Sequence, residues 1–203
     1  MLKVEWNKLG KRFGLKWVFR DLNGVIPSGG HIVIKGSNGS GKSTFGKLLV
    51  GATDATEGDV VWTLSGEEID IDEIPQKIAW SAPFIEVPEE MTIEEVIEFH
   101  NNFRKSWSEN FMNELLVNSG LKSHSMAQVK TLSSGQKQRL RLILAMGTKA
   151  DLVVLDEPCS NLDESGIQWY GKELEDLVNR TTVVVCSNNR PEEHLKGAVE
   201  ISL

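Results

Sequence analysis

Hydrophobic and polar positions along the 203-residue chain follow two periods, one typical of strands and one typical of helices. Continuous apolar runs at 31–35, 151–158 and 181–186 predict buried strands. Residues 2–6 alternate apolar and polar side chains, which predicts a half-exposed strand, and residues 16–26 give a second strand region. The N-terminal part is therefore expected to form an antiparallel β layer.

Shorter apolar segments are expected to add further strands. Short strands are predicted at 60–62, near 69–71 and at 78–80, and the tail at 199–203 is expected to form an edge strand. Residues 7–14 are polar with two glycines and are expected to form a loop.

Helical periodicity predicts helices over 43–51, 92–104, 108–119, 134–148 and 167–177. In the second of these, Thr92 and Glu95 fit a capping box, in which side chain and backbone satisfy each other at the helix start. The apolar positions of that helix, Ile93 and Phe103 among them, are expected to lie on one side, opposite its glutamates.

The stretch 36–44 reads G-S-N-G-S-G-K-S-T and fits the phosphate-binding loop G-x-x-x-x-G-K-[ST] between a strand and a helix. Its three glycines permit positive φ and a close backbone approach to phosphate. Lys42 is expected to reach the β- and γ-phosphates, and the Ser43 hydroxyl to ligate Mg²⁺. The alternative is a glycine-rich turn that binds nothing. The expected ATP-binding residues of the loop are Gly36, Ser37, Asn38, Gly39, Ser40, Gly41, Lys42, Ser43 and Thr44.

The second half of the chain supplies two carboxylates at the end of a predicted buried strand, 151–158. Asp156 is expected to hold Mg²⁺ together with Ser43. Glu157 follows and is expected to orient and polarise the attacking water, so it is the candidate catalytic residue. Residues 84–135 are interpreted as a small helical subdomain inserted into a nucleotide-binding core.

The octet 132–139, L-S-S-G-Q-K-Q-R, lies at the start of a predicted helix. Hydroxyls, backbone N–H groups and the helix dipole there favour an anion, although Ser-Ser-Gly in isolation is also an ordinary helix cap. The octet resembles the signature sequence of the ATP-binding cassette (ABC) family, usually written LSGGQ. The motifs of that family occur in the family's order over nearly the whole chain.

This resemblance implies an α/β fold, with a P-loop NTPase core at 1–83 and 136–203, an N-terminal antiparallel β layer and a helical subdomain at 84–135. It also implies ATP and Mg²⁺ as cofactors and a head-to-tail pair of nucleotide-binding subunits with ATP between them. Each ATP would then lie between the phosphate loop of one subunit and the signature residues of the other, here Ser133, Ser134, Gly135 and Gln136.

Two further assignments follow from the resemblance. Asp163, in S-N-L-D, corresponds to the family's D-loop. Phe13 stands where the family places an aromatic that stacks on adenine; a core aromatic is the alternative reading, and Trp17 is a second candidate for the stacking role.

The chain departs from the family pattern at two positions. Pro83 stands where the family usually has a Gln, and Asn188 where it has a His that contacts the γ-phosphate. Asn can donate a hydrogen bond but carries no positive charge. Asn188 is therefore kept as a catalytic candidate, with the hypothesis that hydrolysis is slow or depends on a partner.

Composition narrows the function classes. Lys and Arg number 22 against 29 Asp and Glu, a net charge of −7. An acidic chain without a basic run argues against general nucleic-acid binding. Cys159 and Cys186 fit no metal or redox spacing and are expected to be reduced structural thiols. No apolar run approaches the ~20 residues that a membrane helix needs, so a cytoplasmic location is expected.

The sequence is therefore interpreted as the ATP-hydrolysing subunit of an ABC transporter. It is expected to work on the cytoplasmic face of the membrane through separate integral-membrane subunits, which would contact the loop at 81–91. It loosely resembles the small ATPase subunits of heme-export or cytochrome c maturation systems. The alternatives are a non-transport ABC protein and an ATP-binding clamp or sensor with weak hydrolysis.

Overall fold

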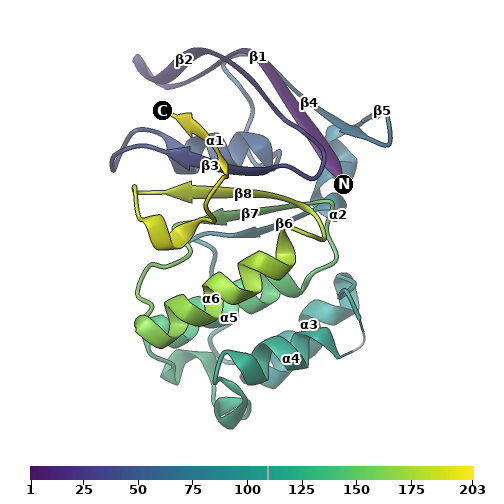
Figure 1. The fold of residues 1–203 in the computed structure, drawn as a ribbon, viewed down its shortest axis with the longest axis vertical. Coiled ribbons are helices and arrows are strands. Elements are labelled where there is room, and N and C mark those ends of the chain that lie inside the picture. The colour runs from purple at the N-terminus through teal and green to yellow at the C-terminus, as the bar shows by residue number, and fades with distance from the viewer. Residues whose placement is uncertain (109) are drawn as a thin grey trace.

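A computed structural model describes residues 1–108 and 110–203 and contains two sheets (Figure 1). The first is antiparallel, in the order β2-β1-β4-β5. Its strands are β1 (Leu2–Phe13), β2 (Lys16–Ile26), β4 (Glu57–Leu64) and β5 (Glu67–Ile69). The second is parallel, in the order β6-β7-β8-β3-β9. Its strands are β3 (His31–Lys35), β6 (Ile78–Ser81), β7 (Leu152–Asp156), β8 (Thr182–Ser187) and β9 (Val199–Ser202).

The helices lie between and below these sheets in Figure 1. They are α1 (Lys42–Leu49), α2 (Ile74–Lys77), α3 (Ile93–Phe103), α4 (Phe111–Asn118), α5 (Ser134–Gly147) and α6 (Glu164–Leu177). The expected fold class, an α/β nucleotide-binding core with an N-terminal antiparallel layer, is confirmed. None of the helices in the described ranges is both long enough and apolar enough to cross a bilayer.

Residues 7–14 do not form the expected loop, because β1 continues to Phe13. The pairing of β1 with β2 shifts register after Trp6, and Lys8 takes a left-handed conformation with φ 48°. Bulges of this kind insert residues without ending a strand. The polar, glycine-containing stretch therefore bends β1 but does not interrupt it.

One hydrophobic cluster joins the two sheets through α1. In it, Phe45 of α1 is fully buried and meets the Trp6 ring edge-on, with 5.1 Å between the centroids. The N-terminal layer therefore packs directly on the helix that follows the phosphate loop. Burial of each large apolar side chain of this kind contributes about 1.5–3 kcal/mol.

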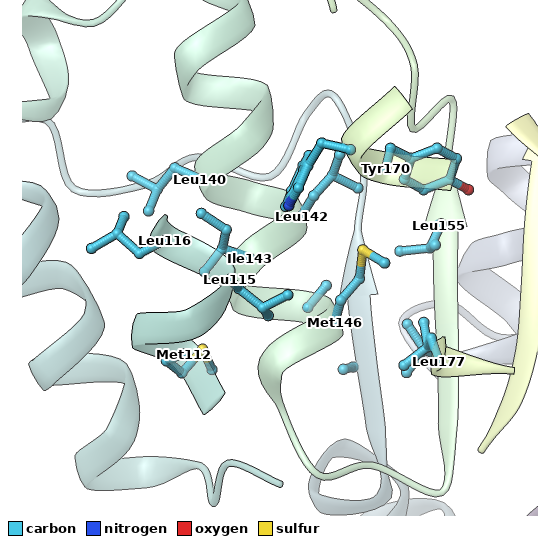
Figure 2. Packing of buried hydrophobic residues seen from close by; sticks show 14 of the residues in the cluster. Met112, Leu115, Leu116, Leu140, Leu142, Ile143, Met146, Leu155, Tyr170 and Leu177 are labelled. Carbon is cyan, nitrogen blue, oxygen red and sulfur yellow. The ribbon is translucent and has the colours of Figure 1, made fainter. Parts of the chain in front are cut away.

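A second cluster lies on the other face of the parallel sheet and includes residues of α3, α4, α5 and α6 (Figure 2). Leu115 of α4, Ile143 of α5 and Tyr170 of α6 are at most 1% exposed within it. The helices at 93–118 thus share one core with the helices that cover the sheet. The division into a core at 1–83 and 136–203 and a helical subdomain at 84–135 stays a prediction.

The start of α3 matches its predicted cap, but its end does not match its predicted face. Glu95 N–H donates to Thr92 Oγ1 at 3.2 Å, and Thr92 N–H donates to Glu95 Oε2 at 2.7 Å. Phe103 was expected on the apolar side, yet it is 73% exposed. Phe103 lies only about 20° round the helix from Val96, which is 3% exposed, so its place as the last residue of α3, not its angle, separates it from the core. There it pairs with Phe99, with 5.1 Å between the ring centroids.

Candidate nucleotide-binding site

The phosphate loop runs from the end of β3 to the start of α1. Gly39 and Gly41 have φ values of 82° and 105°, the left-handed region that favours glycine. A Cβ on Gly41 would also lie 2.5 Å from Val18 Cγ1. Gly36 does not have positive φ. A larger residue is disfavoured there because a Cβ would lie 2.2 Å from Ser40 Oγ.

Lys42 is folded back under this loop. The residue is only 4% exposed, and its Nζ donates to the carbonyls of Gly36 at 2.8 Å and Ser37 at 3.0 Å. The start of α1 has no side-chain cap, so its first amides remain available. These amides and the Lys42 ammonium give the loop a positive potential suited to phosphate.

An open pocket of about 300 Å³ lies on the loop. It is lined by Val18, Asn38, Gly39, Gly41, Lys42, Ser43, Thr44 and Glu157. The fold thus brings the predicted phosphate loop together with the predicted catalytic carboxylate, although 113 positions separate Thr44 from Glu157 in the numbering.

Asp156 ends β7 beside the loop. It is 1% exposed, and neither carboxylate oxygen has a hydrogen-bond partner. Burial raises the pKa of Asp156, while the nearby Ser43 hydroxyl and the Lys42 charge offset part of that rise. A buried carboxylate without partners, next to a hydroxyl, is a donor set that fits Mg²⁺. The role of Asp156 and Ser43 as magnesium ligands stays a prediction that this donor set fits.

Glu157 and Asn188 lie in contact because β7 and β8 are neighbouring parallel strands. Asn188 Nδ2 donates to Glu157 Oε1 at 2.6 Å, and Ser160 Oγ donates to Glu157 Oε2 at 3.2 Å. The Glu157 backbone takes φ 47° and donates its N–H to Cys186 O at 2.9 Å. The second side-chain atom of Asn188, Oδ1, is buried and has no partner.

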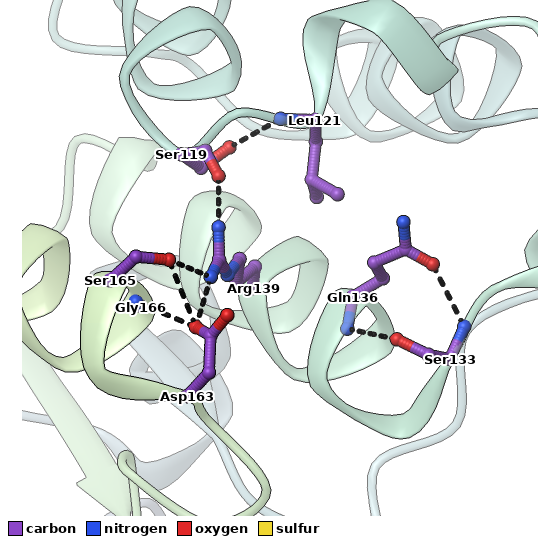
Figure 3. Close-up of polar contacts among 8 residues, drawn as sticks. All are labelled: Ser119, Leu121, Ser133, Gln136, Arg139, Asp163, Ser165 and Gly166. Atoms are coloured by element: carbon purple, nitrogen blue, oxygen red, sulfur yellow. Dashed lines mark hydrogen bonds and ion pairs between the residues drawn. The ribbon is translucent and has the colours of Figure 1, made fainter.

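The signature residues form the N-terminal cap of α5 (Figure 3). Gln136 N–H donates to Ser133 Oγ at 3.2 Å, and Ser133 N–H donates to Gln136 Oε1 at 2.9 Å. This capping box occupies the Gln136 side-chain oxygen and leaves the Ser133 hydroxyl hydrogen free to donate. Ser133 and Ser134 are exposed. Gly135 instead lies close to another segment, since a Cβ there would be 2.7 Å from Asn161 O.

Asp163 caps α6 and is paired within the chain. Its Oδ1 accepts from Gly166 N–H at 2.9 Å and from Ser165 Oγ at 3.0 Å, and forms an ion pair with Arg139 (Figure 3). Arg139 was not among the residues predicted from sequence. Its only sequence signal was its place at the end of the octet 132–139.

The family model described as "ABC transporter" matches residues 19–160, more than half of the chain. The chain belongs to this family. Its match begins in β2 and covers the phosphate loop, the signature residues and the two carboxylates after β7.

Individual relatives are named as ATP-binding proteins. The zinc import ATP-binding protein ZnuC of Rhizobium meliloti is 32% identical over 174 residues, 85% of this chain, but the chain spans only 53% of that protein. The cytochrome c biogenesis ATP-binding export protein CcmA of Aliivibrio fischeri is 26% identical, with 85% of each chain covered. A solved structure of a putative ABC transporter ATP-binding protein from Pyrococcus furiosus has the same fold, with a TM-score of 0.81 at 23% identity over 99% of this chain and 97% of the other.

In this ABC protein Phe13 is 60% exposed, so it is not a core aromatic. The Lys11 ammonium lies 5.3 Å from its ring centroid. Trp17 is half-buried, and the guanidinium groups of Arg12 and Arg20 lie 5.4 Å and 4.6 Å from its ring centroid. Phe13 therefore presents more free ring surface than Trp17 does.

A second opening of this ABC protein lies between the segment after β6 and the helices α3 and α5. This groove has a volume of about 500 Å³. Its lining includes Trp80, Ile85, Val87, Phe99, His100 and Arg104. Beside it, Phe84 follows Pro83 and packs on Trp80 at 5.1 Å between ring centroids, with the Lys47 ammonium 4.4 Å from its own centroid. Phe84, which contacts Lys47 of α1, therefore follows directly after Pro83, the position where a Gln was expected.

Proposed function

We propose that this chain is the ATP-binding and ATP-hydrolysing subunit of an ABC transporter. The observation that carries this proposal is the placement of Asp156, buried and without hydrogen-bond partners, beside the phosphate loop and one residue before Glu157. Family membership supports the same conclusion.

In this proposal the phosphates of ATP lie on the amides of the loop 36–44, and Lys42 turns from its two carbonyl partners to the β- and γ-phosphates. Phe13, exposed on the N-terminal layer, stacks on adenine. Ser43 and Asp156 hold Mg²⁺, which neutralises negative charge on the phosphates when it is bound.

Glu157 is the residue proposed to orient and polarise the attacking water. It lines the pocket on the loop. One of its carboxylate oxygens accepts a hydrogen bond from Asn188, and the other accepts one from Ser160. A carboxylate held by two hydrogen bonds is already oriented for the reaction, so less of its motion has to be lost in the transition state.

We propose that two such chains close head to tail around two ATP molecules. Ser133, Ser134 and the N–H groups at the start of α5 are positioned to meet a phosphate from outside, since the serines are exposed and the helix dipole favours an anion. One chain alone does not bring these residues to its own loop pocket, whose lining contains none of them. A closed two-fold dimer would complete both sites.

The groove between α3, α5 and the segment after β6 supports a membrane-subunit contact at 81–91. Apolar side chains such as Ile85 and Phe99 line it together with His100 and Arg104, a composition suited to an amphipathic segment of a partner. In this proposal the chain reaches the cytoplasmic face of the membrane only through such subunits. The two relatives differ in cargo by name, zinc import against cytochrome c biogenesis export, and cargo choice is assigned to the membrane subunits.

A second candidate is an ATP-gated clamp with weak hydrolysis. It is favoured by Asn188, which bonds Glu157 in the free chain and cannot carry the positive charge of a histidine. In that case ATP would still close the dimer, but turnover would be slow.

The test is steady-state Mg-ATP hydrolysis by the purified chain, with Glu157→Gln and, as a matched control, Glu164→Gln on the exposed start of α6. We expect turnover to fall about 10²–10⁴-fold in Glu157→Gln and to stay at the parent level in Glu164→Gln. ATP binding without turnover in the parent chain would favour the clamp. Absence of ATP binding would contradict both candidates.

A further inference from the structure

The segment 157–163 leads from Glu157 to the first turn of α6 and is held by α5 at three places. Gln138, 1% exposed, donates from Nε2 to Pro158 O at 3.0 Å. The backbone at Gly135 approaches Asn161 so closely that a Cβ would lie 2.7 Å from Asn161 O. At the far end, Arg139 forms the ion pair with Asp163. The helix that begins with the signature residues therefore fixes the whole length of this segment.

Arg139 of α5 contacts both the end of α4 and the start of α6. Nη1 donates to Ser119 O, at the end of α4, at 2.5 Å. Nη2 donates to Ser165 Oγ at 2.8 Å and pairs with Asp163 (Figure 3). The side chain is only 16% exposed, and a Cβ on Gly166 would lie 3.0 Å from its Nε. The planar guanidinium thus fills a shaped space and bonds in two directions at once, which a lysine cannot do.

The elements joined in this way are those that would face the second chain in the proposed dimer. The exposed serines 133 and 134 lie at one end of α5, and the segment 157–163 lies beside that end. The same segment carries Ser160, which donates to Glu157. A displacement of the segment would therefore move both the surface offered to the second chain and the group that orients Glu157.

We infer that Arg139 is a positioning residue that fixes the segment 157–163 against α5, so that both present one preformed surface to the ATP held by a second chain. This inference rests on the proposed function. It predicts that Arg139 matters for ATP-driven closure of two chains and leaves ATP binding by one chain unchanged, because no atom of the loop 36–44 contacts it in the described hydrogen bonds and ion pairs.

The test compares Arg139→Gln with Lys137→Gln. Each removes one cation and one ion pair from α5, but Lys137 pairs with Glu89, away from the segment. Arg139→Lys keeps the charge and serves if Arg139→Gln folds poorly. Hydrogen exchange of the single chain is measured first. We expect faster exchange at 160–166 in both Arg139 variants, and parent-like exchange there in Lys137→Gln. Unchanged exchange at 160–166 in the Arg139 variants would overturn the inference whatever the protein's function.

Closure is then measured in a Glu157→Gln background by ATP-dependent dimerisation, alongside binding of a fluorescent ATP analogue to the single chain. We expect dimerisation to weaken about tenfold in Arg139→Lys, equivalent to about 1.4 kcal/mol, with single-chain ATP affinity unchanged. Asp163→Asn keeps the helix cap but removes the ion pair. Because it removes the same interaction, combining it with Arg139→Lys should weaken dimerisation little further. Parent-like dimerisation, or an equal loss of single-chain affinity, would overturn the positioning role. If the Glu157→Gln parent itself fails to dimerise, the proposed function fails, and the positioning role with it, while the exchange result still reports whether Arg139 holds the segment.

Discussion

The side-chain amide of Asn188 donates a hydrogen bond to the carboxylate of Glu157, with 2.6 Å between Nδ2 and Oε1. The two residues follow adjacent strands, β7 and β8, so their contact is set by the backbone of the parallel sheet. The contact gives Asn188 a definite place in the proposed reaction, as the group that holds the carboxylate acting on water. It also leaves Asn188 Oδ1 buried and unpartnered at the same site.

Asn188→Ala is expected to lower kcat about 10- to 100-fold while ATP binding persists. A hydrogen bond to a charged group is worth about 1.5–3 kcal/mol, and its loss frees the Glu157 carboxylate. Ser160→Ala removes the longer bond to Oε2, 3.2 Å, and is expected to have a smaller effect. Steady-state kinetics with Mg-ATP measure both; equal effects of the two variants would contradict the role given to Asn188.

Asn188→His tests why hydrolysis would be slow. Histidine can donate to the γ-phosphate and can carry a positive charge, so turnover is expected to rise, most clearly toward pH 6 where the imidazole becomes protonated. A pH–rate profile of parent and variant measures this. An unchanged kcat throughout that profile would remove residue 188 as the feature that limits turnover.

Asp156→Asn is expected to stabilise the free protein and to abolish its stabilisation by Mg-ATP. The pKa of Asp156 is raised by burial, so ionisation costs stability as pH rises above about 3.8. Removing a buried, unpartnered charge should therefore gain about 1–3 kcal/mol at pH 7.5, roughly 2–12 °C in Tm, and little near pH 4. Thermal melts with and without Mg-ATP at both pH values measure this. A variant that melts below the parent at pH 7.5 would show that the Ser43 hydroxyl and the Lys42 charge outweigh the cost of burying the Asp156 carboxylate.

Sequence patterns located the phosphate loop, Asp156 and Glu157 because each combines a local motif with a predicted buried strand, and strand ends fix side chains in a parallel sheet. Such patterns failed where packing overrides local composition. The polar stretch around Lys8 stays in β1 because β2 and β4 pair with it on both sides. Phe103 has helical spacing but is the last residue of α3, where it is 73% exposed.

Contacts between distant segments could not be read from spacing at all. Gly36 was assigned a conformational role, whereas it is needed for space beside Ser40. Arg139 bonds Asp163 across 24 positions, and Asn188 bonds Glu157 across 31. These distances in sequence carry no periodic signal, because the tertiary fold alone sets them.

Glu193→Gln is expected to flatten the pH dependence of stability. Glu193 lies in the turn after β8, is fully buried, and has no hydrogen-bond partner on either carboxylate oxygen. Burial raises its pKa, so the parent is most stable below about pH 4.5 with respect to this group and loses stability as pH rises through the higher folded pKa. The variant should therefore gain Tm over the parent at pH 8, and much less at pH 5.

Glu192→Gln is the matched control, one residue away and with the opposite sign. Backbone hydrogen bonding, with the Arg190 side chain, lowers the pKa of Glu192, so this group stabilises the fold above about pH 4.5. Its loss should lower Tm slightly at pH 8 and not at low pH. Melting curves are recorded for both variants. If their Tm values shift in the same direction at pH 8, the sign assigned to Glu193 is refuted.

Gly135→Ala is expected to disrupt the contact between the signature residues and the segment 157–163. The added Cβ would lie 2.7 Å from Asn161 O, a backbone atom that can retreat only if the segment moves. ATP-dependent dimerisation in the Glu157→Gln background should weaken, with single-chain ATP binding retained. Gly171→Ala on α6 is the control, because a Cβ there meets nothing within 4 Å and alanine favours a helix by about 1 kcal/mol over glycine. Gly171→Ala should raise Tm and leave dimerisation alone. If Gly135→Ala dimerises as the parent does, the close approach of α5 to this segment has no part in closing the two chains.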